Sequence, residues 1–187
     1  MKQESAVKYI LRLALTLLLI TGVVAAALAG VNSITASKIL ENQQVKTQEA
    51  IQAVLPGATI SGEVAFTDTS GLVKTVYRAD KAYAVEVAPV GFGGAITMMV
   101  GVSYEGAVLG VAVISQTETA GLGAIVAADS QAGQSFRDQF IGLSGQLAVE
   151  KDGGEIDSVT GATITSRAVT EGINAALACI ANMEKIG

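Results

Sequence analysis

Residues 157–166 read DSVTGATITS and stand between a short extended segment, at 155–159, and the clearest helical pattern of the chain, at 163–185. The N-terminus of a helix presents unpaired N–H groups and the positive end of the helix dipole, which together favour an anion. Gly161 permits a tight turn or the close approach of a ligand. An N-cap needs one hydroxyl, but four fall within seven positions here, on Thr160, Thr163, Thr165 and Ser166. The stretch therefore predicts either a phosphate-binding turn or a plain helix cap.

The segments before this stretch predict a β-sheet. Five of them are rich in Val, Ile, Tyr and Thr and are bounded by Gly, Asp or Ser, at 59–66, 73–79, 82–88, 95–104 and 108–115. A short helix is expected at 135–141 and a short strand at 146–149, and Ile164 and Ile173 fall on the apolar side of the last helix. Together these elements predict an α+β domain, with a mainly antiparallel sheet flanked by helices.

A membrane span is predicted near the N-terminus. Residues 13–31 contain no charged side chain, and as a helix they extend over roughly 28 Å, close to the thickness of the bilayer hydrocarbon. Residues 1–12 carry a net charge of +2, which favours a cytoplasmic N-terminus with the remainder outside. A cleaved signal peptide is the alternative, since residues 27–29 (ALA) resemble a cleavage site. The apolar run exceeds the usual signal-peptide core, so a retained single-pass anchor is favoured.

The pattern divides the chain into four parts. We expect a cytoplasmic N-terminus at 1–12, a transmembrane helix at 13–31, a connecting helix at 32–57 that Pro56-Gly57 ends, and one domain at 58–187. The connecting helix continues from the span or closely follows it. It serves as a stalk or docks against a neighbouring subunit.

The composition excludes most side-chain chemistry. The chain has 187 residues, no histidine, no tryptophan and one cysteine. Without histidine there is no Ser-His-Asp triad and no His-ligated zinc or haem, and one cysteine forms no internal disulfide or iron–sulfur cluster. We expect Cys179 to be a small buried hydrophobe, or less plainly a cluster ligand shared with a partner. The formal net charge of −5 argues against nucleic acid as a partner. No catalytic residue and no metal site are predicted, so any redox chemistry comes from a borrowed cofactor.

The pattern Asp157-x-x-Thr160-Gly161-Ala162-Thr163-x-Thr165 resembles the D-x-x-[ST]-G-A-[ST]-x-[ST] motif of the covalent FMN-binding domain family. The resemblance implies FMN whose terminal phosphate is esterified to the hydroxyl of Thr165. It also implies a separate flavin transferase that makes this bond with FAD as donor. Within the motif, Asp157 is expected to orient the turn or to assist attachment.

A second segment adds to the resemblance. Residues 118–123 (ETAGLG) are similar to the E-T-P-G-L-G segment that lies against the flavin ring in this family. Ala120 replaces the usual proline and Gln116 stands where a histidine is frequent, so the loop is expected to be less rigid and the histidine's role absent. The segment implies flavin contacts from Glu118, Thr119, Gly121, Leu122 and Gly123.

Two further features fit the same family. Residues 91–94 (GFGG) resemble its G-[YF]-G-G loop, which places Phe92 at the flavin, and residues 135–142 resemble its short helix. For Phe92 and Leu122 the alternative is a position in the core. Lys151 and Arg167 are the nearest cations in sequence, and each pairs with the phosphate or is simply solvated.

The order of parts is similar to that of G subunits of Rnf complexes, which are ion-pumping ferredoxin:NAD+ oxidoreductases. This resemblance implies an electron-transfer subunit that contacts membrane lipid and other subunits and does not complete a reaction alone. It also implies a single-pass protein of the inner membrane with the FMN domain on the extracytoplasmic side. The alternatives are the usually longer C subunit of the sodium-pumping NADH:quinone reductase, a sensor of a free phosphorylated ligand, and a pilin-like scaffold.

Overall fold

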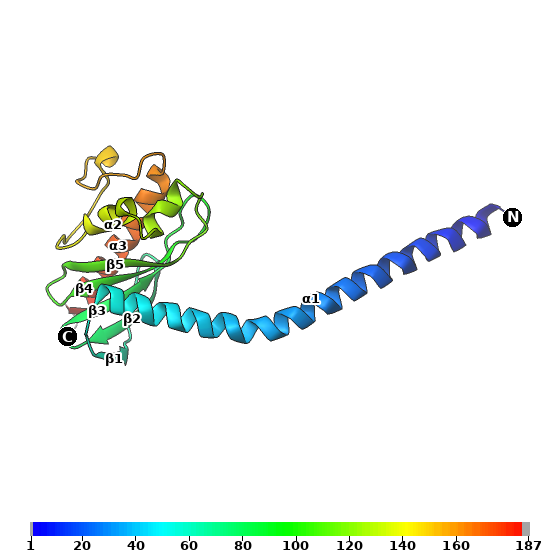
Figure 1. Cartoon of the computed structure of the whole chain (residues 1–187), viewed down its shortest axis with the longest axis horizontal. Coiled ribbons are helices and arrows are strands. Elements are labelled where there is room, and N and C mark those ends of the chain that lie inside the picture. The colour runs from blue at the N-terminus through cyan, green and yellow to red at the C-terminus, as the bar shows by residue number, and fades with distance from the viewer. Residues whose placement is uncertain (1, 185–187) are drawn as a thin grey trace. The chain divides into compact units, whose positions relative to one another are not determined.

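The computed structural model describes residues 2–184 and has an α+β architecture (Figure 1). One long helix, α1 (Lys2–Val54), precedes a five-stranded sheet, and the remaining helices follow the sheet in sequence. The strands are β1 (Ile60–Glu63), β2 (Val73–Ala79), β3 (Ala82–Val87), β4 (Thr97–Ser103) and β5 (Val108–Ser115). The later helices are α2 (Gln131–Asp138), α3 (Thr163–Glu184) and two short 3₁₀ turns, η1 (Gly123–Ala127) and η2 (Glu150–Asp152).

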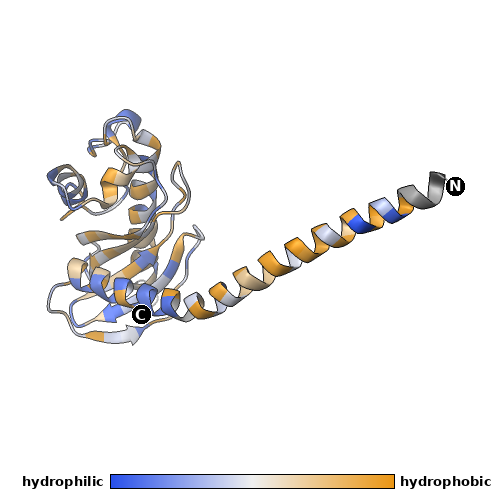
Figure 2. Cartoon of the chain, turned by 45° about the vertical axis from the view of Figure 1, so that its right-hand side comes forward, coloured by the Kyte–Doolittle hydropathy of each residue, from blue (hydrophilic) through white to orange (hydrophobic). Residues whose placement is uncertain are grey.

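The first helix runs without interruption from Lys2 to Val54, so it includes the predicted span and continues into the predicted connecting segment, ending three residues before the predicted 57. Within it the structure has a segment long and apolar enough to cross a membrane, and Figure 2 shows that stretch of α1 as mostly hydrophobic. Its apolar side chains, such as Leu15 and Leu18, are exposed. Thr21 lies in this segment, and its hydroxyl donates to the carbonyl of Leu17 at 2.9 Å. A hydroxyl bonded within its own helix needs no water, so this position is compatible with lipid.

The sheet is a simple antiparallel meander in the order β1-β2-β3-β4-β5. Its central register aligns Val85 with Val100 and Val100 with Val111. The mainly antiparallel sheet expected from the sequence is therefore confirmed. β1 ends at Glu63 and is shorter than its predicted segment at 59–66.

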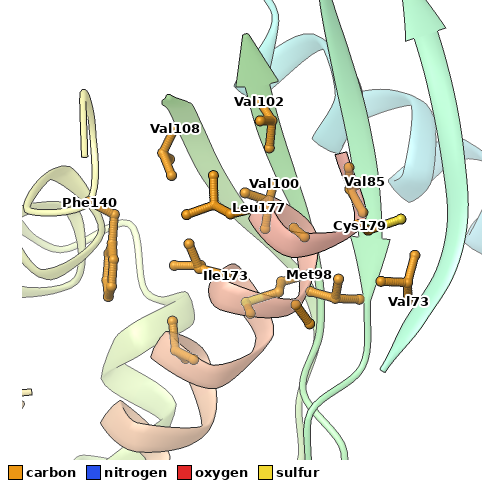
Figure 3. Packing of buried hydrophobic residues seen from close by; sticks show 14 of the residues in the cluster. Val73, Val85, Met98, Val100, Val102, Val108, Phe140, Ile173, Leu177 and Cys179 are labelled. Carbon is orange, nitrogen blue, oxygen red and sulfur yellow. The ribbon is translucent and has the colours of Figure 1, made fainter. Parts of the chain in front are cut away.

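One face of the sheet packs against α3. Side chains alternate along a strand, and in β4 this directs Met98, Val100 and Val102 into the main core together with Ile173 and Leu177 of α3 (Figure 3). The backbone of α3 at Gly172 lies close to the side chain of Met98, because a Cβ atom at Gly172 would lie only 2.4 Å from Cε of Met98. The helix that follows the threonine-rich turn is thus held along the sheet. Cys179 is buried in this core, as expected, and burial raises the pKa of its thiol to about 11.

The opposite face of the sheet packs against the last turns of α1. Ala50, Ile51, Val54 and Leu55 form a second cluster with small residues of β3, such as Ala84, and with Met99. Gly101 of β4 and Gly110 of β5 are paired across the sheet. A Cβ atom at Gly101 would lie 2.9 Å from the carbonyl oxygen of Val54, and one at Gly110 would lie 3.1 Å from its Cα. Two side-chain-free positions therefore let the backbone of α1 rest on the sheet.

Two local predictions need correction. The strand predicted at 146–149 is wrong, because only Val149 pairs, in an isolated parallel bridge with Ile156. The side chain of Asn174 accepts from the N–H of Leu147 at 2.9 Å and donates to its carbonyl at 2.8 Å. A side chain thus takes the backbone groups that a neighbouring strand would need.

The helix predicted at 135–141 lies earlier in the chain, as α2, and ends at Asp138. It begins earlier because Ser130 caps it by accepting from the N–H of Gly133. The last helix agrees with its prediction from Thr163 onward, and Lys185, its predicted end, lies outside the described residues.

Candidate functional site

The N-terminus of α3 begins at Thr163, after a turn in which Gly161 adopts a positive φ of 76°. A residue with a side chain is disfavoured there. Ser166 ties the turn to the helix, because its hydroxyl accepts from the N–H of Val159 and donates to the carbonyl of Ala162, each at 3.0 Å. One of the four hydroxyls therefore holds the turn in place, and the other three are left for other partners.

Thr165 is buried, with 1% of its surface exposed, and its hydroxyl donates to Oε2 of Glu118 at 2.5 Å. Glu118 comes from the segment after β5, 47 residues earlier in the chain, and is only 8% exposed. Its carboxylate also accepts from the backbone N–H groups of Gly93 at 2.7 Å and Phe92 at 3.3 Å. Glu118 thus joins three separate segments: the GFGG loop, its own segment and α3.

The glycines around this carboxylate are needed for space. A Cβ atom at Gly123 would lie 2.6 Å from both Oε2 of Glu118 and Oγ1 of Thr165, and one at Gly91 would lie 2.5 Å from Oε1 of Glu118. Any side chain at these two positions would collide with the buried pair. The glycines of the 91–94 and 118–123 segments therefore allow the hydroxyl and the carboxylate to meet.

A cavity of about 330 Å³ opens beside this pair, within the usual size range of small-molecule sites. Its lining residues come from the same three segments: Phe92, Glu118, Thr119, Leu122, Gly123, Gly161, Ala162, Thr163, Ile164 and Thr165. Nine of the twelve site residues named from the sequence are among them.

Three of the predicted site residues, Asp157, Thr160 and Gly121, are not among the lining residues. The side chain of Asp157 is exposed, and its peptide group is held by Gln139, whose side chain accepts from its N–H at 2.8 Å and donates to its carbonyl at 3.2 Å. Ile164 lines the cavity and was not predicted to do so. Its signal was its place in the motif, between two threonines.

Apolar side chains surround the mouth of the cavity. Phe92 is 70% exposed, Ile164 51% and Leu122 44%. The interpretation of Phe92 and Leu122 as core residues is therefore wrong. Large exposed apolar side chains gathered at a cavity are typical of ligand sites, and these three offer apolar contact to an aromatic ring.

Two cations lie near the turn, and the structure separates their roles. Nζ of Lys151 donates to the hydroxyl of Thr163 at 2.9 Å. Arg167 instead forms a two-bond ion pair with Asp152, at 2.7 and 2.6 Å, and this pairing lowers the pKa of Asp152. Lys151 is thus placed beside the helix N-terminus, whereas Arg167 is committed to a carboxylate.

The arrangement fits a ligand with a flat aromatic part and a phosphate. A buried hydroxyl, a helix N-terminus and an ammonium group stand at one side, and exposed apolar side chains surround the opening. FMN has both parts, so the residues present fit this cofactor.

Comparison with known families gives two matches. Residues 91–178 match the FMN-binding domain, and residues 1–54 match the RnfG N-terminal region. The first range contains the GFGG loop, Glu118 and Thr165. The second ends at Val54, where α1 ends.

Relatives cover nearly the whole chain. The G subunit of the Na(+)-translocating ferredoxin:NAD(+) oxidoreductase complex of Acetobacterium woodii is 30% identical over 95% of this chain and 95% of its own length. The G subunit of the proton-translocating ferredoxin:NAD(+) oxidoreductase complex of Clostridium ljungdahlii is 36% identical over 84% of this chain and 83% of its own. The chain belongs to this family of G subunits. Another member, the G subunit of an ion-translocating oxidoreductase complex of Stutzerimonas stutzeri, is 34% identical over 88% of the chain and 78% of its own length.

Membership in the G-subunit family agrees with both resemblances drawn from the sequence, to the FMN-binding domain and to the G subunits. It also gives the long first helix a context. The apolar stretch of α1 lies within the residues that match the RnfG N-terminal region.

Proposed function

We propose that this chain is an electron-transfer subunit that carries covalently bound FMN in a membrane-bound, ion-translocating ferredoxin:NAD+ oxidoreductase complex. The buried hydroxyl of Thr165, at the cavity formed by the family's flavin-associated segments, carries the proposal. FMN, once bound, supplies the one- and two-electron chemistry that no side chain of this chain provides.

Each part of the site has a place in this function. Thr165 provides the oxygen of the phosphoester. Thr163, Lys151 and the N–H groups of the first turn of α3 stabilise the charge of the phosphate. Phe92, Leu122 and Ile164 contact the flavin ring and keep water from part of it. The cavity wall is completed by the remaining lining residues, Glu118, Thr119, Gly123, Gly161 and Ala162.

The predicted residues outside the cavity act on its shape. Thr160 and Gly121 stand in the two turns that flank it, and Gly121 adopts a positive φ of 76°. Asp157 precedes the threonine turn, and the bonds from Gln139 to its peptide group fix where that turn begins.

The membrane arrangement follows from charge and hydropathy. Residues 13–31 cross the inner membrane once, residues 1–12 stay in the cytoplasm, residues 32–57 connect, and the FMN domain at 58–187 lies outside. A covalent bond keeps the cofactor in a compartment where free FMN would be lost. The partners are the other subunits of the complex, membrane lipid and the flavin transferase. Alkaline phosphatase becomes active only outside the cytoplasm. When it is fused to the C-terminus of this chain, cells should therefore show phosphatase activity.

Flavin attachment tests the proposal directly. The full chain is produced with a flavin transferase, denatured, separated on a gel and viewed under ultraviolet light. We expect a fluorescent band for the unchanged protein and for Thr165→Ser, none for Thr165→Ala, and an added mass of one FMN on the peptide that contains Thr165. Thr69→Ala is the matched control, because Thr69 is exposed, lies outside the cavity and is not part of the motif.

Two results would contradict the proposal. A band that survives Thr165→Ala would place the flavin elsewhere. Absence of a band from the unchanged protein, when a relative is labelled in the same cells, would exclude covalent FMN and favour a reversibly bound phosphorylated ligand.

A further inference from the structure

Glu118 is a buried carboxylate whose partners are hydrogen-bond donors rather than a cation. It accepts from two backbone N–H groups, of Phe92 and Gly93, and from the hydroxyl of Thr165. Neither ion pair found within residues 2–184, Lys38–Glu41 and Arg167–Asp152, includes it. Among the hydrogen bonds of the described residues, the one that joins this carboxylate to a side chain is therefore with the hydroxyl that the proposed function esterifies, while the backbone N–H of Glu118 donates to Oε1 of Gln116.

A threonine hydroxyl is a weak nucleophile until a base takes its proton. The chain has no histidine to do this. Lys151 contacts Thr163 instead, and Asp157 has an exposed side chain. Oε2 of Glu118, at 2.5 Å from Oγ1 of Thr165, is within the distance that proton transfer requires.

We propose that Glu118 is the general base of its own chain's flavin attachment, an inference that rests on the proposed function. The donor is a flavin dinucleotide held by the transferase. Oγ1 of Thr165 forms a bond to the phosphorus of the FMN part while the phosphoanhydride bond to the adenylate part breaks. The electron pair of that bond leaves with AMP, the proton of the hydroxyl passes to Oε2 of Glu118, and nothing is oxidised or reduced.

The product state favours the same assignment. After esterification Oγ1 has no hydrogen to donate, and the phosphodiester brings a negative charge close to Glu118. An ionised carboxylate would then face a like charge, whereas a protonated one donates a hydrogen bond to the phosphate. Gly123 keeps the pair in contact, because a Cβ atom there would lie 2.6 Å from each partner. The proton that Glu118 takes up thus relieves the repulsion that the reaction creates.

The test measures how fast the purified full chain, in detergent, is labelled by a transferase with FAD. For Glu118→Gln we expect the initial rate to fall by about 10²-fold or more, the scale of general base catalysis. The amide still accepts from the backbone N–H of Gly93, so the fold should be kept, and the Tm of each protein is measured beside its rate. Glu171→Gln, an exposed glutamate of α3, is the matched control and should be labelled at the unchanged rate.

Two readouts separate a base from a structural residue. The rate of Glu118→Gln divided by that of the unchanged protein should rise toward one as the pH falls, because protonation removes the base only from the unchanged protein. Formate should restore part of the rate of Glu118→Ala, since it supplies a small carboxylate to the space left behind, and acetate should do so less well.

Each outcome bears on one of the two proposals. If the unchanged protein takes no flavin, the proposed function fails and this inference fails with it. If it is labelled and Glu118→Gln is labelled at the same rate, only the role of Glu118 is overturned. A slow variant with a lowered Tm, a rate ratio independent of pH and no formate rescue would also overturn it, because Glu118 would then only support the fold.

Discussion

The two faces of the sheet hold their helices by opposite means. On one face α3 inserts long side chains, such as Ile173 and Leu177, among the valines and methionine of the strands. On the other face the last turn of α1 sets its backbone at Val54 against two glycines, Gly101 and Gly110, with alanines around them. One contact depends on side-chain volume and the other on its absence.

The two faces contribute differently to the stability of the domain and to the geometry of the site. The face of α3 buries the larger apolar side chains, so it supplies most of the stability, and it fixes the helix that begins with Thr163 and Thr165. A site on a well-packed helix keeps its geometry. The face of α1 buries smaller groups and joins the domain to the apolar segment. Changes on the first face should therefore affect stability and site together, and changes on the second should affect neither as strongly.

The largest effect is expected on the α3 face. Ile173→Ala removes a fully buried side chain, and should lower the free energy of unfolding by about 3–4 kcal/mol. Denaturant unfolding of the full chain in detergent measures this. Ile164→Ala, on the same helix but 51% exposed, is the control and should change stability by less than about 1 kcal/mol. Equal effects from the two variants would remove the basis for the comparison.

An intermediate effect is expected on the α1 face. Gly101→Ala places a Cβ atom 2.9 Å from the carbonyl oxygen of Val54. It should lower the free energy of unfolding by about 1–3 kcal/mol, the usual effect of overpacking. Hydrogen exchange should become faster at residues 50–55, while flavin attachment stays at the unchanged level, because α3, which begins at the site, packs on the opposite face of the sheet.

Gly30→Ala is the matched control for Gly101→Ala, because a Cβ atom there would meet nothing within 4 Å. If Gly101→Ala slowed flavin attachment while hydrogen exchange at residues 50–55 changed little, the two faces would not act separately.

The smallest effect concerns Glu86, a half-buried carboxylate of β3 that shares its face with Ala82 and Ala84. Burial, and then repulsion from Glu63, raise the pKa of Glu86 above its ordinary 4.5. A raised pKa means that the folded protein favours the protonated form of Glu86. The contribution of Glu86 to stability is therefore present below its pKa in the unfolded chain, and it is lost as the pH rises through its pKa in the folded protein. Glu86→Gln should therefore stabilise the protein at pH 7, by less than about 1 kcal/mol.

The measurement is the Tm of both proteins between pH 4 and pH 8. The difference in Tm between the unchanged protein and Glu86→Gln should shrink as the pH falls toward the ordinary pKa of a glutamate, because position 86 is then neutral in both proteins. Glu105→Gln, at an exposed hairpin position, should give no such trend. A difference that is independent of pH would mean that the charge of Glu86 is not what costs stability.

Sequence patterns predicted the fold where the determinants are local. The bounds of β2 and β5 agree with the predicted 73–79 and 108–115, because alternation and the flanking turns lie within each segment. The failure at 146–149 has a distant cause, since Asn174, 27 residues away, takes the backbone groups of Leu147. The shift of α2 has a local cause that was overlooked, the cap at Ser130.

The candidate site divides in the same way. The turn before α3 was predictable because Gly161 and the hydroxyls mark it within ten residues. The contact between Thr165 and Glu118 spans 47 residues, and no spacing predicts it. Ile164 was assigned to the apolar side of the helix by periodicity, but the first turn of α3 lies at the cavity, where that side chain is exposed.

The placement of Thr165 also fixes an order of events in the life of the chain. Its hydroxyl meets Glu118, which also accepts from the GFGG loop, only when the segment after β5 and α3 are packed together, so no unfolded chain has the assembled site. A transferase that requires this site acts on finished domains. The intensity of flavin fluorescence on a gel would then report how many molecules have folded, and a chain that misfolds would give no fluorescent band.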